Sequence, residues 1–133
     1  MIGLDTCVLV RYFAQDDSRQ TRLATGVIES LTYARRGFVP LAALVELIWV
    51  LKRRYAFTRK RLSAVLVTFV ASRWVTVESL VTVCRAIALY ATTRIDFGDC
   101  VILRTCQRQG CDVTYTFDAQ ASRVPGFRAV PEW

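Results

Sequence analysis

Four carboxylates in this chain stand beside apolar segments. Asp5 and Asp118 each close an apolar or β-branched run, Asp99 opens one, and Glu46 interrupts one. Burying a carboxylate is unfavourable unless the group is paired or bound to a metal. Two carboxylates about 4 Å apart repel by roughly 4 kcal/mol at an effective dielectric constant near 20. If the fold brings the four together, the sequence therefore predicts a site that holds a cation.

The available donor atoms restrict the kind of cation. The chain has no histidine, and its 5 cysteines form no C-x-x-C pair. This composition argues against a zinc site and against a disulfide framework, so we expect reduced thiols. An all-oxygen ligand set suits Mg²⁺ or Mn²⁺, with waters completing the coordination shell.

Each acid also has a simpler structural interpretation. Asp5 precedes an expected helix and fits an N-cap. Asp96, followed three residues later by Asp99, fits a capping arrangement, and Asp118 fits a turn. Glu46 is the strongest candidate, because an acid inside an apolar helical segment has no capping role; its structural alternative is an exposed edge position. The remaining acids lie in polar or turn contexts and are expected in solvent or cap roles: Asp16, Asp17, Glu29, Glu78, Asp112 and Glu132.

Basic residues dominate the charge of the chain. The net charge is +7, and all but two of the 18 basic residues are arginine. The planar guanidinium group suits phosphate, so a basic surface around an acidic cluster indicates a polyanion bound beside a metal. The alternative is that the arginines form solvated helix faces in an organism that favours arginine over lysine.

The expected elements define an α/β fold in a single domain, residues 1–133. Hydrophobic periodicity and turn residues predict alternating strands and helices, and therefore a mainly parallel sheet with helices on both faces. No segment reaches the roughly 18 apolar residues of a membrane helix, so we expect a soluble, cytoplasmic protein. The expected strands are 2–5, 38–39, 74–77, 113–117 and 127–130. One expected helix begins at Thr6. The other expected helices span 20–34, 40–55, 58–72, 80–92 and 96–110, and a helical turn is expected at 118–123.

The predicted topology explains how distant acids can converge. In parallel sheets, functional groups collect outside the carboxyl ends of the strands. Asp5 and Asp118 fall at such ends, while Asp96 and Asp99 share the first turn of the helix before the Asp118 strand. Glu46 lies about one and a half turns into its helix, so its carboxylate faces either the core or this edge.

Four motifs occur together in an order and spacing that match a known family. They are Leu4-Asp5-Thr6-x-Val8-Leu9, Leu44-x-Glu46-Leu47-x-Trp49-Val50-Leu51, Asp96-Phe97-x-Asp99-x-x-Ile102 and Thr116-Phe117-Asp118. Together they resemble PIN-domain ribonucleases, and most closely the VapC-type toxins of prokaryotic toxin–antitoxin pairs. The resemblance covers essentially the whole chain.

The resemblance implies a PIN-like fold, with roughly five parallel strands between helices, and Mg²⁺- or Mn²⁺-dependent cleavage of RNA of the tRNA or rRNA class. It also implies a homodimer and a cognate VapB-like antitoxin that occupies the active-site groove. By position, the catalytic and metal-binding acids are Asp5, Glu46, Asp99 and Asp118. The accessory residues are the acid Asp96 and the hydroxyls that orient carboxylates or metal waters, Thr6 and Thr116.

The acids and arginines suggest a mechanism. Metal held by the acids lowers the pKa of a water that attacks the phosphorus in line, and arginines offset the charge on the oxygens. No histidine or lysine pair is available for the 2′-hydroxyl route, so we expect 5′-phosphate and 3′-hydroxyl ends. The candidate phosphate contacts are Arg11, Lys52, Arg53, Arg54, Arg59, Lys60 and Arg61.

Two other functions stay open. The same surface can bind RNA or a partner without catalysis, although an intact acid set argues against this. A metal-dependent DNA nuclease of the same fold is the second alternative. A haloacid dehalogenase-like phosphatase would place an aspartate where Cys7 stands, and a receiver domain would need a late lysine, whereas none follows Lys60.

Overall fold

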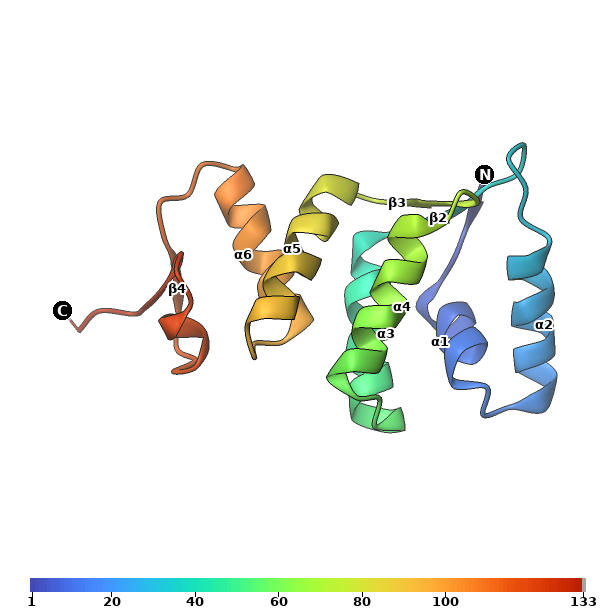
Figure 1. The fold of residues 1–133 in the computed structure, drawn as a ribbon, viewed down its shortest axis with the longest axis horizontal. Coiled ribbons are helices and arrows are strands. Elements are labelled where there is room, and N and C mark those ends of the chain that lie inside the picture. Colours follow the sequence, from blue (N-terminus) through green and yellow to red (C-terminus); the bar gives the residue numbers. More distant parts are fainter. Residues whose placement is uncertain (133) are drawn as a thin grey trace. The chain divides into compact units, whose positions relative to one another are not determined.

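The computed structural model describes residues 1–132. The chain forms two compact units, Met1–Leu80 and Val81–Trp133, and each is described by itself. Within the described residues, parallel strands alternate with six α-helices, which confirms the predicted α/β class (Figure 1). Strands occur in all five predicted places; three form one hydrogen-bonded sheet and two form another.

The sheet of the first unit is parallel throughout. It contains β1 (Ile2–Gly3), β2 (Gly37–Val39) and β3 (Val75–Val77), in the order β1-β2-β3. The central strand pairs with both neighbours, and Phe38, for example, lies opposite Thr76. Because the strands run in the same direction, the segments that follow them start from one edge of the sheet.

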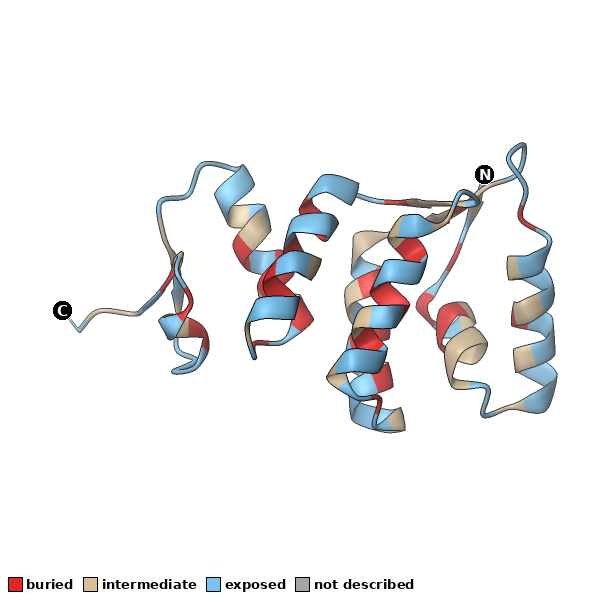
Figure 2. Cartoon of the chain, in the orientation of Figure 1, coloured by how far each residue is buried: buried red, intermediate tan, exposed pale blue. Residues whose placement is uncertain are grey.

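Four helices accompany this sheet: α1 (Thr6–Ala14), α2 (Ser18–Glu29), α3 (Leu41–Tyr55) and α4 (Arg59–Ala71). Helix α1 contacts α2 and α3, α3 contacts α4, and α4 packs against β3. Buried residues follow the facing sides of these helices (Figure 2). Burial of each large aliphatic side chain contributes about 1.5–3 kcal/mol. The fully buried leucines at the centre are Leu9, Leu44, Leu47, Leu51 and Leu66.

Helix α2 is shorter at its C-terminus than predicted. The expected helix over 20–34 is wrong beyond Glu29, and the structure starts it earlier, at Ser18. The Ser30 hydroxyl donates to the carbonyl of Val27, and Thr32 and Arg35 exchange backbone hydrogen bonds in a turn. Serine and threonine side chains compete with helical bonding in this way, and the periodicity of apolar residues does not reveal it.

The N-terminus of α3 is capped from a distant part of the chain. Pro40 occupies the N-cap position and offers no side-chain acceptor there. Glu78, directly after β3, accepts a hydrogen bond from the Leu41 amide at 2.8 Å. Of the two roles expected for Glu78, solvent or cap, the structure shows the cap, and the capped amide lies 37 residues earlier in the chain.

The second unit combines two helices with a small parallel sheet. Its helices are α5 (Leu80–Thr92), which begins at the last residue of the first unit, and α6 (Phe97–Arg108). The strands β4 (Thr114–Thr116) and β5 (Phe127–Ala129) flank the short 3₁₀ helix η1 (Ala121–Arg123). The core residues with no exposed surface are Val83, Ala86, Cys100 and Leu103.

Gly126 before β5 is required by geometry. Its φ of +103° lies in a region that other residues rarely adopt. A Cβ atom there would stand 2.7 Å from Nε2 of Gln107 and 3.0 Å from a methyl group of Leu103. The glycine thus lets β5 approach α6 closely.

Candidate active site

Asp5 sits two residues after β1 and begins α1. Its Oδ1 accepts a hydrogen bond from the Thr6 amide at 2.8 Å, and the Cys7 thiol lies 3.5 Å from Oδ2. The capping interpretation of Asp5 is therefore confirmed. Capping uses one carboxylate oxygen for the backbone and is compatible with metal binding through the other, because each oxygen carries two lone pairs.

Glu46 shares a cavity with Asp5. The cavity has a volume of about 250 Å³, and its lining includes Asp5, Thr6, Glu46, Arg54 and Tyr55. We call it the acid pocket; its other lining residues are Cys7, Val10, Arg11 and Val50. Two of the four predicted acids, which stand 41 positions apart in the sequence, thus face one space.

The acids are more accessible than their apolar neighbours suggested. Asp5, Glu46 and Asp118 are exposed and Asp99 is half-buried, so Glu46 has the exposed position that was its structural alternative. The reason is helical geometry for Glu46, since adjacent residues on a helix point about 100° apart. Leu47 is fully buried, while the adjacent Glu46 in the same turn is exposed to solvent.

A hydrogen-bond network fixes Arg11 at the wall of the acid pocket. Nη1 of Arg11 donates to both carboxylate oxygens of Asp16, at 3.0 and 3.1 Å, and to the Tyr55 hydroxyl at 3.2 Å. The Tyr55 hydroxyl donates to Asp16 at 2.6 Å, and Nε of Arg11 donates to Gln20 at 2.6 Å. The group joins α1, α2 and the end of α3.

This network shifts the protonation equilibria of its charged members. The Tyr55 hydrogen bond, reinforced by the charge of Arg11, lowers the pKa of Asp16 below its ordinary 3.8. The same hydroxyl and the charge of Asp16 raise the pKa of Arg11. Both side chains therefore stay charged at neutral pH.

The other candidate RNA contacts lie where α3 ends and α4 begins. Lys52, Arg53 and Arg54 form the last turn of α3, where cations are favoured by the helix dipole. Arg54 lines the acid pocket. Arg59, Lys60 and Arg61 form the first turn of α4, and the Thr58 side chain caps it by accepting from the Arg61 amide. Arg54 therefore brings a cation to the acid pocket, and the other five basic residues lie at these two helix ends.

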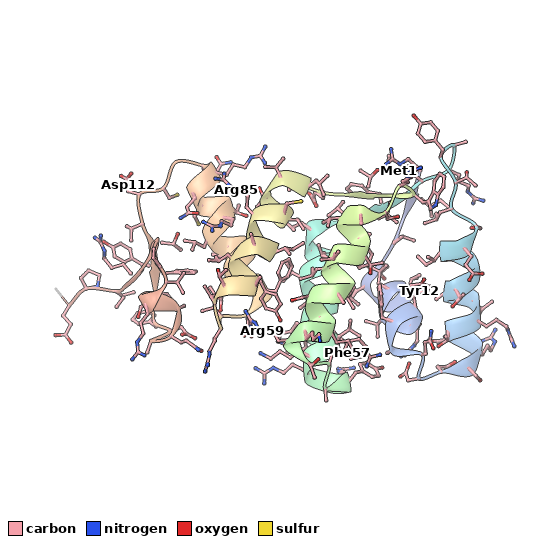
Figure 3. The ribbon with its side chains drawn as sticks, in the orientation of Figure 1. Met1, Tyr12, Phe57, Arg59, Arg85 and Asp112 are labelled. Carbon is pink, nitrogen blue, oxygen red and sulfur yellow. The ribbon has the colours of Figure 1, made fainter. Side chains whose placement is uncertain are left out.

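The turn between these helices also orders one arginine. The Arg61 guanidinium lies 3.7 Å from the centre of the Phe57 ring, a close cation–π contact. Figure 3 labels Phe57 and Arg59 at this turn. Stacking leaves the edge of the Arg61 guanidinium available for hydrogen bonds, because the contact uses only its face.

Asp118 occupies the second unit in a setting that resembles that of Asp5. It follows β4 by two residues, and its Oδ1 accepts from the Ala121 amide at 2.8 Å. Thr116, predicted as an accessory hydroxyl, accepts from the Asp118 amide at 3.0 Å. The turn interpretation of Asp118 is therefore confirmed, and Thr116 helps to hold that turn.

Asp96 and Asp99 stand at the start of α6. Asp96 has the extended backbone of an N-cap, and its carbonyl accepts from the Cys100 amide at 3.1 Å. Asp99 lies in the first turn, as predicted, and is half-buried. Two acids at a helix N-terminus are favoured by the helix dipole whether or not they bind metal.

The acid pocket offers oxygen donors, the type of ligand that a hard cation prefers. Asp5 and Glu46 offer carboxylate oxygens, which Mg²⁺ and Mn²⁺ prefer. Among residues 1–132, however, no three acidic or cysteine side chains gather closely enough to hold a metal ion. The structure therefore brings Asp5 and Glu46 together, whereas the contribution of Asp99 and Asp118 stays a prediction.

Sequence reasoning missed two residues that shape the acid pocket. Tyr55 was not singled out, and Asp16 was expected to face solvent or cap a helix. A partial signal existed, since Arg11 and Asp16 are close enough in the chain to pair across a helix end. Nothing in the sequence indicated that Tyr55 would join them, because 39 residues separate it from Asp16.

A comparison with protein families matches residues 2–126 to the PIN domain. The match spans nearly the whole chain, so the protein belongs to the PIN family, and its strand and helix order agrees with that fold. PIN domains form a nuclease family; its members are typically metal-dependent and generally use Mg²⁺. Comparisons with curated proteins and with solved structures gave no match. None of the helices in the described part of the chain has the length and hydropathy that a membrane crossing requires.

Proposed function

We propose that this PIN protein is a metal-dependent endoribonuclease toxin that cleaves RNA of the tRNA or rRNA class. The observation that carries the proposal is the acid pocket, in which Asp5 and Glu46 face one space together with Arg11 and Arg54. Carboxylates suit the cation, and guanidinium groups suit the phosphate that the cation must meet. A bare acidic cluster would repel the same phosphate.

The residues of the pocket divide the work of phosphodiester cleavage. Asp5 and Glu46 would hold the Mg²⁺ or Mn²⁺, which supplies Lewis-acid polarisation and a more acidic water when bound. Arg54, at the end of α3, donates hydrogen bonds to phosphate oxygens and offsets their charge. Thr6, buried at the start of α1, fixes Asp5 by donating its amide to Oδ1.

Asp99 and Asp118 complete the proposed ligand set, with Asp96 as an accessory acid. This part of the proposal depends on the sequence motifs and on the family match over residues 2–126. The Ala121 amide holds the Asp118 carboxylate, while Asp96 and Asp99 lie at the N-terminus of α6, where the helix dipole favours carboxylates.

The proposal includes two protein partners. We expect a cognate VapB-like antitoxin, which inhibits the nuclease by covering the active-site groove, and a second copy of the chain in a homodimer. The net charge of +7 suits an acidic inhibitor as well as RNA. A small reading frame that encodes a DNA-binding fold next to this gene would identify the antitoxin for co-expression.

Cleavage of total RNA tests the proposed activity. The purified chain should cut RNA with Mg²⁺ or Mn²⁺ and should stop when EDTA is added. Asp5→Asn should abolish cleavage, because asparagine can still accept the Thr6 amide but loses the charge that binds metal. Asp112→Asn, a neutralised exposed acid in the second unit, is the matched control and should cut normally.

The same assay separates the alternatives. RNA that is bound with a Kd unchanged by EDTA, and never cut, would favour a binding module. Cleavage of single- or double-stranded DNA in preference to RNA would favour a DNA nuclease. Induced expression should arrest bacterial growth with the wild-type chain and not with Glu46→Gln, and normal growth in both cases would contradict the toxin role.

A further inference from the structure

Arg11 is held more tightly than a surface arginine needs to be. Its Nε group donates to Gln20, and its Nη1 group donates to Asp16 and Tyr55. These bonds fix the plane of the guanidinium and use three of its five N–H groups. Nη2 forms no hydrogen bond with any residue that the structure describes, so two donors remain.

The anchoring residues come from separate elements. Asp16 lies between α1 and α2, Gln20 lies in α2, and Tyr55 is the last residue of α3, the helix that carries Glu46. The Thr21 hydroxyl also donates to the backbone carbonyl of Arg11 at 3.2 Å. Arg11 is therefore tied to the same framework that places the acids.

Without this anchoring, the Arg11 guanidinium would be free to pair with other carboxylates of the acid pocket. Asp5 and Glu46 line the same cavity, and a mobile guanidinium pairs readily with a carboxylate in a bidentate arrangement. Such a pair would occupy the oxygens that a cation needs.

We propose that Asp16 and Tyr55 are positioning residues, which hold Arg11 off the Asp5 and Glu46 carboxylates and present its Nη2 donors to an RNA phosphate at the acid pocket. This inference rests on the proposed function. It predicts that Asp16 and Tyr55 act only through Arg11, so that their removal has no further effect once Arg11 is gone.

Binding of Mn²⁺ alone, measured by titration calorimetry or electron paramagnetic resonance without RNA, gives the first test. Asp16→Asn and Tyr55→Phe should each weaken Mn²⁺ binding by about 3- to 10-fold, because the released arginine competes for the carboxylates. Adding Arg11→Gln to either variant should restore the wild-type Kd. Single variants that bind Mn²⁺ like the wild type, or double variants that stay weak, would overturn the proposal.

RNA binding in EDTA gives an independent second test, with a single-stranded RNA oligonucleotide as the probe. Arg11→Gln should reduce the slope of log K against log salt by about one. Tyr55→Phe should reduce the slope similarly, and the Arg11→Gln, Tyr55→Phe double variant should match Arg11→Gln. Additive losses in the double variant would show that Tyr55 acts elsewhere.

Three control variants change the same groups at exposed positions: Tyr33→Phe, Asp112→Asn and Arg19→Gln. Each should leave the Mn²⁺ Kd unchanged, and circular dichroism should confirm that every variant is folded. If the wild-type chain neither binds Mn²⁺ nor cuts RNA, the proposed function fails. If it does both and the Asp16 and Tyr55 variants behave like the controls, only the positioning role fails.

Discussion

The two units place an aspartate in the same local setting but surround it differently. Asp5 follows β1 and Asp118 follows β4, each two residues beyond the strand, and each accepts a backbone amide at 2.8 Å. Beyond Asp5 runs the nine-residue helix α1, whereas beyond Asp118 there is only the three-residue turn η1. The acid pocket lies around Asp5, where α3 adds Glu46, Arg54 and Tyr55.

The shared feature is a strand that is followed by an aspartate accepting a backbone amide. The local motif accounts for the cap, and both units have it. A pocket needs elements that arrive from elsewhere in the chain, and in the first unit these are α3 and the Asp16 loop. Asp118→Asn removes the charge of this residue and keeps an oxygen that can accept the Ala121 amide, so the variant tests metal binding separately from capping.

The largest expected effect is on cleavage. Glu46→Gln and Asp118→Asn should each lower kcat by about 1,000-fold, or about 4 kcal/mol, if both units supply metal ligands. Single-turnover cleavage of RNA with Mg²⁺ measures the loss, and Glu29→Gln is the matched control for the first unit. Full activity in Asp118→Asn would show that Asp118 holds the turn after β4 and is not a metal ligand.

The next effect is on stability and compares the two cores. Leu47→Ala in α3 and Leu103→Ala in α6 remove fully buried side chains, and each should lower the free energy of unfolding by about 3 kcal/mol. Because we predict one domain over residues 1–133, both should shift a single urea transition. Two transitions, each moved by only one of the variants, would show that the units unfold separately.

A smaller effect concerns the cap of α3 in the first unit. Glu78→Ala should lower stability by about 1 kcal/mol, because the Leu41 amide loses its acceptor. Glu78→Gln keeps an acceptor oxygen and should lose much less. Chemical denaturation of the two variants provides the measurement, and equal losses would indicate that the charge of Glu78 matters more than the hydrogen bond.

The smallest expected effect is the pH dependence from Asp16. Its folded pKa is lowered below 3.8 by the Tyr55 hydrogen bond and Arg11, so its stabilisation is complete above that value and is lost as pH falls through the folded pKa. Asp16→Asn should therefore be less stable than the wild type at pH 7, and the gap should narrow near pH 3. A gap that stays constant with pH, or that appears also in Asp112→Asn, would contradict this origin.

Much of the fold could be predicted because local patterns determine its elements. The bounds of α5 at 80–92, the start of α4 after Thr58 and the strand β3 at Val75–Val77 depend on neighbouring residues, which one sequence displays. The end of α2 could not be predicted, since side chains of Ser30 and Thr32 redirect the backbone after a regular helical pattern.

The site was predictable in its charged residues and not in the network that positions them. Asp5 and Glu46 stood out because they contrast with apolar neighbours, and they do line one pocket. Their apolar neighbours did not indicate burial, because a residue next to a buried position on a helix can itself be exposed. Tyr55 and Asp16 meet across 39 residues, and no periodicity encodes such a contact.

The distant cap of α3 has a consequence for the order of folding. The acceptor of the Leu41 amide belongs to Glu78, so it leaves the ribosome 37 residues after the amide that it caps. The loop between them must close before the first turn of α3 is satisfied, and closing a loop of this length carries an entropic penalty. The helix that carries Glu46 thus gains this cap only after β3 and Glu78 have been synthesised.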